Sequence, residues 1–188
     1  MQSMGSNDMK FSDILDQIGQ TDKNTYHTYG FWYDVWFEKI RKDATDVMEI
    51  GVCAFGGGCV LSLASYFPNA TIWGIDIDCG PCTDAVKGHP RINLISADAY
   101  CPEFTERLDV QFDLIIDDGS HEIADQLHLL QLLRPYIKDN GFYVIEDCCT
   151  VHWLPRLPTI RSIQLQQTIV DMSTERTYDN TLIRFDPV

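Results

Sequence analysis

Short apolar runs recur through the middle of the chain, and each one ends at a carboxylate or at a glycine turn. The segments between them carry apolar residues at helical spacing. Strands that alternate with helices in this way predict a parallel sheet covered on both faces, with right-handed crossovers. The predicted strands are residues 47–50, 71–75, 92–95, 112–116 and 142–145.

The N-terminal part has a helical pattern. Residues 11–19 and 30–42 are predicted as amphipathic helices, the second rich in aromatic side chains that favour a core or interface position. We expect residues 1–9 to form a flexible lead-in. Residues 10–188 are expected to form a single domain, in which residues 10–45 make an N-terminal helical cap.

The C-terminal part changes to a strand pattern. Residues 167–172 and 181–185 favour two strands joined by a polar turn that contains Asp179 and Asn180. Together with the five central strands, they predict an α/β, Rossmann-like fold. Its sheet is seven-stranded and mostly parallel, and it ends in a C-terminal antiparallel hairpin.

Composition and charge narrow the class of protein. The chain has 188 residues, of which 45% are hydrophobic and 22% charged, as in a soluble globular domain. No apolar run is long enough to span a membrane, and no secretory signal is visible, so we expect a cytoplasmic protein without a membrane partner. The net charge of −14 argues against a nucleic-acid partner. The seven cysteines, an odd number, are expected to be reduced.

The ends of the first three strands carry signals of a nucleoside site. Gly51 and Gly56 lie in a strand–helix turn with the spacing of a dinucleotide-binding loop, but Cys53 stands where a second glycine is usual. Asp76 follows the second strand, where a carboxylate can bind both ribose hydroxyls. Asp98, after the third strand, can address an adenine amino group. NAD and S-adenosylmethionine are both candidates. NAD would usually require glycine at position 53, so that its pyrophosphate can approach the backbone. S-adenosylmethionine has no pyrophosphate, so Cys53 favours it.

The ends of the fourth and fifth strands carry an acidic cluster with one imidazole. Asp117, Asp118 and His121 follow the fourth strand, and Glu146 and Asp147 follow the fifth. The carboxyl ends of parallel strands share one edge of a sheet, so these groups are expected to share a cleft. Such a set suits a divalent cation and a general base. For His121 the alternative is a capping or core histidine.

Several segments resemble one known family. They are TDKNTYHTY at 21–29, EIGV at 49–52, YFPNA at 66–70, GIDID at 74–78, IDDGSH at 116–121 and YVIED at 143–147. This pattern is similar to the class I S-adenosylmethionine-dependent O-methyltransferases of the macrocin and mycinamicin sugar type, which are related to the cephalosporin-biosynthesis methyltransferases. The resemblance covers roughly residues 21–155.

The resemblance implies a class I methyltransferase fold and Mg²⁺-assisted methyl transfer to a hydroxyl of a small molecule, with a sugar or another natural product as the acceptor. It implies a metal site at Asp118, Glu146 and Asp147, with His121 as the base. The expected cofactor-binding residues are Lys23, Tyr29, Glu49, Gly51, Gly56, Asp76, Ile77, Asp98, Ala99 and Asp117. A homo-oligomer, in which a neighbour completes the cleft, is a further expectation.

The chain also departs from the family pattern. The glycine loop has extra residues, and Gly58 stands where serine is common. The family's Asp-Leu-His-Thr-Ser-Tyr-Trp run is DCCTVHW at 147–153, which borders the expected acceptor site. In that run His152 is either a second base or substrate contact, or a plain loop histidine.

Two alternatives from other classes come from the remaining motifs. Cys79-Gly-Pro-Cys82 is the dithiol motif of thioredoxin-like proteins and suggests an oxidoreductase. The same two cysteines could instead bind zinc together with Cys148 and Cys149. A non-catalytic S-adenosylmethionine-binding subunit, with the aromatic helix at 30–42 as its interaction surface, is the second alternative.

Overall fold

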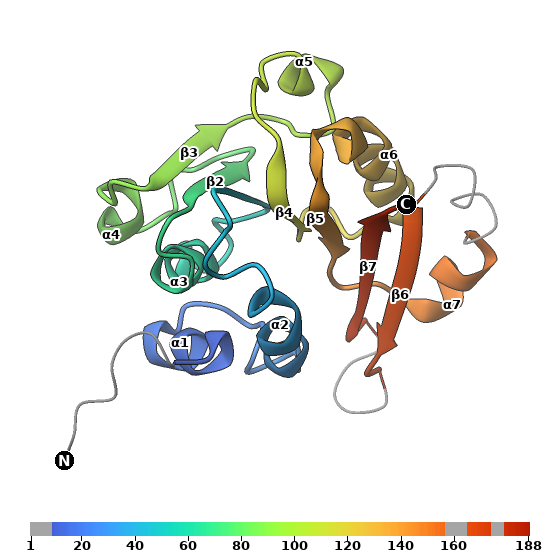
Figure 1. Cartoon of the computed structure of the whole chain (residues 1–188), viewed down its shortest axis with the longest axis horizontal. Helices are drawn as coiled ribbons and strands as arrows, with labels where there is room; N and C mark the ends of the chain where they lie inside the picture. Colours follow the sequence, from blue (N-terminus) through green and yellow to red (C-terminus); the bar gives the residue numbers. More distant parts are fainter. Residues whose placement is uncertain (1–8, 157–164, 174–178) are drawn as a thin grey trace.

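A computed structural model describes residues 9–156, 165–173 and 179–188. The predicted lead-in at 1–9 lies outside the described residues, except for Met9. A seven-stranded sheet in the order β3-β2-β1-β4-β5-β7-β6 forms the centre of the molecule (Figure 1). Its strands are β1 Asp46–Ile50, β2 Thr71–Asp76, β3 Ile92–Ser96, β4 Phe112–Asp117, β5 Ile137–Ile145, β6 Leu165–Asp171 and β7 Thr181–Pro187.

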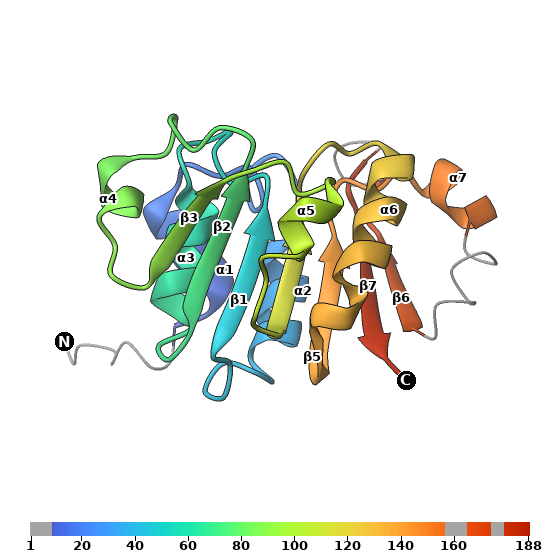
Figure 2. The same cartoon turned by 90° about the horizontal axis from the view of Figure 1, so that it is seen from above.

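Helices cover both faces of this sheet. In Figures 1 and 2, α1, α2 and α3 lie on one face and α5 and α6 on the other, while α4 lies beside β3 and α7 near β6. The α-helices are α1 Phe11–Ile18, α2 Gly30–Phe37, α3 Gly58–Tyr66, α4 Asp84–Lys87, α5 Pro102–Thr105, α6 Ile123–Leu133 and α7 Thr150–Trp153. Two short 3₁₀ helices follow α6 and α7, at Arg134–Tyr136 and Leu154–Arg156. Within the described residues, no helix combines the length and apolar character that crossing a membrane requires.

Strand pairing follows the prediction. The first five strands pair in parallel, and β7 pairs antiparallel with both β5 and β6. Parallel strands are buried on both faces and therefore read as nearly continuous apolar runs. The predicted α/β class, the seven strands and the C-terminal hairpin are all confirmed.

Alternate residues of each strand supply two hydrophobic cores, one on each face of the sheet. In β4, Leu114 and Ile116 pack with α1, α2 and α3, whereas Ile115 packs with α5 and α6. Successive strand side chains point to opposite faces, so each central strand stabilises both layers. The carboxyl ends of β1 to β5 are thereby held along one edge.

Two local predictions were wrong. The predicted helix at 30–42 ends at Phe37, because the following backbone continues as turns, with bonds such as that from the Ile40 N–H to the Phe37 carbonyl. From its residue type, Ser120 is the expected N-cap of the helix after β4, but this helix begins at Ile123 and has Glu122 at its N-cap position. The Ser120 hydroxyl instead donates to Asp125 at 2.8 Å, which ties the loop to the first turn of α6.

Candidate active site

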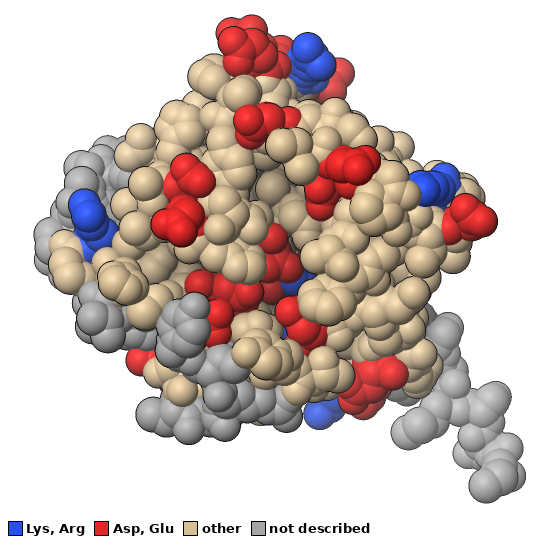
Figure 3. All heavy atoms as spheres, turned by 180° about the vertical axis from the view of Figure 1, so that it is seen from behind, with Lys and Arg blue, Asp and Glu red and all other residues tan. Residues whose placement is uncertain are grey.

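A cavity of about 470 Å³ opens at the carboxyl ends of β1 to β5. Eight of the predicted site residues line it: Gly51, Asp76, Ile77, Asp98, Ala99, Asp118, His121 and Asp147. Figure 3 shows Asp and Glu side chains gathered around a hollow on one face of the molecule. The volume is in the range of small-molecule sites, which is roughly 300–1,000 Å³. The predicted juxtaposition of strand ends is therefore confirmed for these residues.

Gly51 holds two of the site loops in contact. Its φ of +86° is a conformation that L side chains rarely adopt, and a Cβ at this position would lie 1.9 Å from the carbonyl oxygen of Asp118. The Asp118 N–H donates to the Ile50 carbonyl at 3.0 Å in the same region. Only glycine allows this close approach. The turn after β1 thus supports the loop that carries the acidic cluster.

The carboxylate of Asp76 is held by backbone groups on two sides. One oxygen accepts from the Cys53 N–H at 2.9 Å and the other from the Asp78 N–H at 3.1 Å. Its neighbour Ile77 is 79% exposed although it is apolar, and it lines the cavity. A fixed carboxylate beside an exposed apolar surface suits a ligand with hydroxyl groups and a flat ring, as in a nucleoside.

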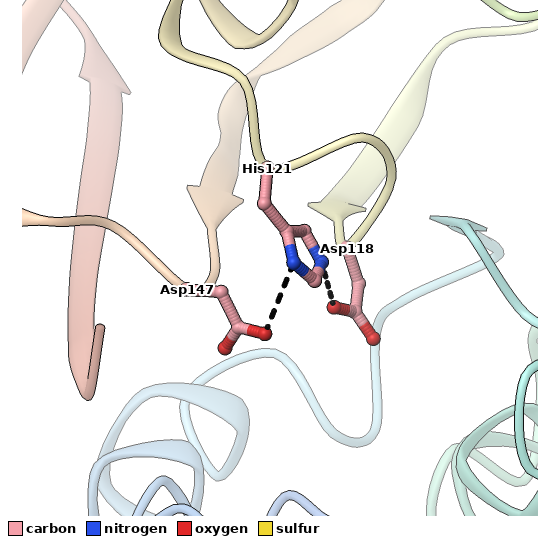
Figure 4. Close-up of side chains that lie close together, drawn as sticks. All are labelled: Asp118, His121 and Asp147. Carbon is pink, nitrogen blue, oxygen red and sulfur yellow. Dashed lines mark hydrogen bonds and ion pairs between the residues drawn. The ribbon is translucent and has the colours of Figure 1, made fainter. Parts of the chain in front are cut away.

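Asp118, His121 and Asp147 converge from the loops after β4 and β5 (Figure 4). The His121 ring lies between the two carboxylates, with Nε2 3.2 Å from Asp118 and Nδ1 3.5 Å from Asp147. One ligand atom from each residue lies within 4.8 Å of the others, which is spacing suited to a metal ion. The hydrogen bond with Asp118, followed by the charge of Asp147, raises the pKa of His121 to about 9.

The backbone at this cluster is strained. Among the described residues, three non-glycine residues have a positive φ, and two of them are His121 at 59° and Asp147 at 53°. Such conformations cost energy and concentrate at functional sites, where they aim side chains that a relaxed loop would direct elsewhere. Here they aim an imidazole and a carboxylate at each other.

Lys23 lies buried behind the cluster. Its ammonium group is 2.6 Å from Asp118 and from Glu146, and 3.4 Å from Glu49. Although burial opposes its charged form, the Asp118 and Glu146 carboxylates raise the pKa of Lys23 well above its usual range. Lys23 and Glu49 do not line the large cavity, but both border a neighbouring cavity of about 20 Å³. Lys23 is therefore the counter-charge that allows these carboxylates to remain buried together.

Glu146 faces the protein interior. It is 1% exposed, with one oxygen bound to Lys23 and the other accepting from the Tyr33 hydroxyl. Gln126 donates to its backbone carbonyl at 3.1 Å. The sequence analysis missed Tyr33 and Gln126, because both occur in apolar helical patterns that look like ordinary core.

Tyr29 supports Asp147 from the N-terminal segment. Its hydroxyl donates to the Asp147 carboxylate at 2.5 Å and accepts from the Asp147 N–H at 3.2 Å. His27 stacks on the Tyr29 ring at 4.8 Å between centroids, with Nε2 3.5 Å from the same carboxylate. Tyr29 does not line the large cavity, so its contact is with the acidic cluster.

Two further predicted residues lie outside the cavity wall. Asp117 is fully buried and accepts from the Tyr143 hydroxyl at 3.0 Å, and burial raises its pKa to about 7. Gly56 has a φ of +78°, and its carbonyl accepts from the Thr83 N–H at 3.0 Å. These contacts order the loops around the cavity.

The cysteines differ from expectation. Cys53 and Cys82 form a disulfide, so the expectation that all thiols are reduced was wrong for this pair. Cys82 is bonded to Cys53, and Cys79 is a free, buried thiol. The Cys79–Cys82 dithiol that suggested an oxidoreductase is therefore not present as a pair. The zinc hypothesis was also wrong. In the described parts of the chain, the one His/Cys/Asp/Glu group with metal-ligand spacing contains no cysteine.

Comparison with solved structures defines the class of protein. The mycinamicin-pathway methyltransferase MycE, solved with Mg, S-adenosylhomocysteine and mycinamycin VI, matches with a TM-score of 0.76 over 97% of this chain and 55% of that chain, at 25% identity. A precorrin-6y C5,15-methyltransferase from Geobacter metallireducens shares the fold with a TM-score of 0.63 at 16% identity, over 87% of this chain and 92% of that chain. The chain thus has the class I methyltransferase fold.

Sequence comparison narrows the class. Mycinamicin VI 2''-O-methyltransferase of Micromonospora griseorubida is 35% identical over 79% of this chain and 38% of its own length. Demethylmacrocin O-methyltransferase of Streptomyces fradiae is 29% identical over 77% of this chain and 40% of its own length. No family model matches. The chain is a relative of the macrocin and mycinamicin sugar O-methyltransferases, and it spans about two fifths of the length of these two curated relatives.

Proposed function

We propose that the chain carries the catalytic site of a Mg²⁺-assisted, S-adenosylmethionine-dependent O-methyltransferase that acts on a hydroxyl of a small molecule. The observation that carries this proposal is the convergence of Asp118, His121 and Asp147 on the wall of the strand-end cavity. A solved relative of the same fold is bound to Mg and S-adenosylhomocysteine. Sequence relatives of the chain are named as O-methyltransferases, and the names of two of them include an L-olivosyl and an α-L-rhamnosyl compound.

S-adenosylmethionine fits the large cavity by the chemistry of its wall. The Asp76 carboxylate, fixed by two backbone N–H groups, is the proposed partner of the ribose hydroxyls. Ile77 and Ala99 would contact the faces of the adenine ring, and Asp98 would accept from its amino group. Gly51 lines this cavity, and its contact with the Asp118 carbonyl would hold the turn after β1 in place beside the methionine end. Lys23, Tyr29, Glu49, Gly56 and Asp117 would act through the loops that they hold.

Mg²⁺ fits the oxygen ligands beside His121. Asp118 and Asp147 supply hard oxygens at suitable spacing, and Mg²⁺ commonly takes one or two carboxylates with substrate or water completing its shell. Glu146 remains a proposed third ligand, which would require it to exchange its hydrogen bond with Lys23. When bound, the ion would supply positive charge that lowers the pKa of the acceptor hydroxyl.

His121 is the proposed general base. Its side chain is 43% exposed and lines the large cavity, and both ring nitrogens lie beside carboxylates that fix its orientation. It would accept the hydroxyl proton of the acceptor as that oxygen bonds to the methyl group of the donor. A cation beside Asp118 and Asp147 would weaken their hold on the imidazolium, so that neutral imidazole is available.

Calorimetric titration of S-adenosylhomocysteine, with Mg²⁺ and with EDTA, tests the proposal. We expect binding in the micromolar range or tighter, and a Mg²⁺-linked heat that Asp118→Ala abolishes without unfolding the chain. Asp78→Asn, on the exposed loop after β2, is the matched control and should retain that heat. No binding under either condition would refute the cofactor assignment, and an unchanged Mg²⁺ heat in Asp118→Ala would refute the metal assignment.

The acidic composition supports one proposal about the binding partner. A net charge of −14 would repel the phosphate backbone of nucleic acid, so the proposed partner is a small molecule. We also propose that the protein is a homo-oligomer and that it is cytoplasmic. Size-exclusion chromatography with light scattering checks the oligomeric state, and fractionation of cells that express the protein checks the location.

A further inference from the structure

A disulfide joins the loops that follow β1 and β2. It bonds Cys53, in the glycine turn after β1, to Cys82, in the segment between β2 and α4. Each of the two cysteines is 3% exposed. Cys53 stands at the position where a second glycine is usual in such a turn. The chain therefore departs from the usual loop pattern at a cysteine that forms the bridge.

The bridged loops contribute to the wall of the large cavity. Ala54 and Phe55 line it from the loop after β1, and Ile77 lines it from the loop after β2. The Cys53 N–H donates to the Asp76 carboxylate at 2.9 Å, so Cys53 supplies one of the two backbone donors that hold the proposed ribose partner. Because the bridge restrains the position of Cys53, it also restrains this donor.

The two loops have a second link that does not depend on sulfur. The Thr83 N–H donates to the Gly56 carbonyl at 3.0 Å. Strands β1 and β2, which precede the two loops, pair in parallel along the whole of β1. Breaking the bridge is therefore expected to loosen the cavity wall and to leave the sheet intact.

A third cysteine lies one turn away from the bridge. Cys79 is a free thiol, and its carbonyl accepts from the Cys82 N–H at 3.3 Å. Such a turn brings the two Cα atoms within about 7 Å, a distance at which a disulfide can form. Gly80 and Pro81, which lie between the two cysteines, are exposed. Cys82 therefore has Cys79 within bonding reach, in addition to its present partner Cys53.

We propose that the Cys53–Cys82 bridge is a redox switch of the donor site. The bridged form binds S-adenosylmethionine more tightly, and a dithiol reductant opens the bridge with Cys79 as the attacking thiol. In the cytoplasm, where we place the protein, disulfides are usually transient and serve catalysis or redox sensing. This inference rests on the proposed function, because it takes the large cavity as the donor site.

Opening of the bridge takes two exchange steps. The Cys79 thiolate attacks the sulfur of Cys82, so that a short-lived Cys79–Cys82 bond forms while the bond to Cys53 breaks. Cys53 leaves as a thiolate and takes up the proton that Cys79 lost, with no net oxidation. The reductant then breaks the new bond in the exposed turn. Its two thiols become a disulfide, and two electrons and two protons pass to Cys79 and Cys82. Oxidised glutathione, a disulfide oxidant, reverses the net reaction.

The test is calorimetric titration of S-adenosylhomocysteine into the oxidised chain and into the chain reduced with dithiothreitol. We expect reduction to weaken binding roughly three- to ten-fold, as for loss of one hydrogen bond such as that from Cys53 to Asp76. Cys53→Ser should bind like the reduced chain under both conditions. Cys149→Ser is the matched control. Cys149 is a free thiol that does not line the large cavity, so this variant should respond to dithiothreitol like wild type.

The rate of opening tests the role of Cys79. Alkylation with iodoacetamide after timed exposure to dithiothreitol, followed by peptide mass spectrometry, measures the fraction of open bridges. Cys79→Ser should retain the Cys53–Cys82 bridge and open it several-fold more slowly than wild type. Equal rates would overturn the role assigned to Cys79.

The outcomes separate this inference from the proposed function. If the reduced chain binds S-adenosylhomocysteine as tightly as the oxidised chain, or more tightly, the inference is overturned and the proposed function stands. If neither form binds it, the proposed function is refuted and the inference with it. If circular dichroism shows that Cys53→Ser does not fold, the comparison of oxidised and reduced wild type decides between these outcomes.

Discussion

Lys23 and Glu146 are 123 residues apart in the chain, yet the Lys23 ammonium group donates to the Glu146 carboxylate at 2.6 Å in the interior. The same ammonium group also binds Asp118, so one residue of the N-terminal segment joins the loops after β4 and β5. The segment before α2 is therefore a structural part of the site. The positive charge of Lys23 permits the carboxylates of Glu49, Asp118 and Glu146 to lie together in the interior.

Replacing Lys23 should destabilise the protein. Lys23→Met removes the buried positive charge and leaves Asp118, Glu146 and Glu49 uncompensated, so we expect a loss of about 3–5 kcal/mol in the free energy of unfolding. Urea denaturation measures it. Lys87→Met, on an exposed residue, should change stability by less than about 0.5 kcal/mol. Equal stabilities of the two variants would show that Lys23 does not neutralise the cluster.

Gly51 offers a test of the contact between the β1 and β4 loops. Gly51→Ala should destabilise the protein and abolish S-adenosylhomocysteine binding, because the new Cβ would meet the Asp118 carbonyl oxygen at 1.9 Å. Gly19→Ala is the control. Its φ is also positive, at +65°, but nothing lies within 4 Å of its Cβ, so only backbone strain of about 1–2 kcal/mol is expected. Similar thermal shifts in the two variants would contradict the contact.

His121 should titrate abnormally in the metal-free protein. Its hydrogen bond with Asp118 and the charge of Asp147 raise its pKa to about 9, and saturating Mg²⁺ should move that pKa down. The interaction stabilises the fold fully below the unfolded pKa of about 6.5, and this contribution is lost as pH rises through about 9. NMR of the histidine ring protons measures both states, with His121→Gln to assign the signal. A metal-free pKa near 6.5 would contradict the cluster geometry.

Tyr29 should change the affinity of the proposed metal site without being one of its ligands. Tyr29→Phe removes the hydroxyl that binds Asp147 at 2.5 Å, and loss of such an orienting group typically lowers metal affinity about 10- to 100-fold. Electron paramagnetic resonance of Mn²⁺ gives the affinity. Tyr136→Phe removes a comparable hydroxyl that binds the Thr105 carbonyl, and it should leave Mn²⁺ affinity as in wild type.

The disulfide should stabilise the loops beside the large cavity. Peptide mapping without reductant should show Cys53 joined to Cys82 and Cys79 as a free thiol. Cys53→Ser should cost about 2–4 kcal/mol of stability, because the bridge closes a loop with a sequence separation of 29. Cys79→Ser should cost less. A Cys79–Cys82 linkage in the peptide map would contradict the assignment.

The sheet and eight of the residues lining the large cavity were predictable from the sequence because they depend on strand ends. An apolar strand that ends in Asp76, Asp98 or Asp118 places that residue at the carboxyl edge whatever the details of packing. The parallel pairing of the central strands and the C-terminal hairpin follow from the same pattern, whereas the order of the strands in the sheet was not predicted.

The supporting residues were not predictable in the same way. Tyr33 reaches Glu146 through the packing of α2, and no local pattern in an aromatic helix marks one hydroxyl as bound to a buried carboxylate. The Cys53–Cys82 bridge joins two loops whose distance is set by the sheet, so spacing alone suggested the wrong partner. Both features are long-range consequences of the fold.

The wall of the large cavity contains six aspartates, with His121 as the one basic side chain among its described residues. Under the proposed function, the donor enters with a positively charged sulfonium and leaves as an uncharged thioether. A negative wall attracts the first more strongly than the second. The field of the site would therefore favour loading of fresh donor over retention of spent product, and so limit product inhibition.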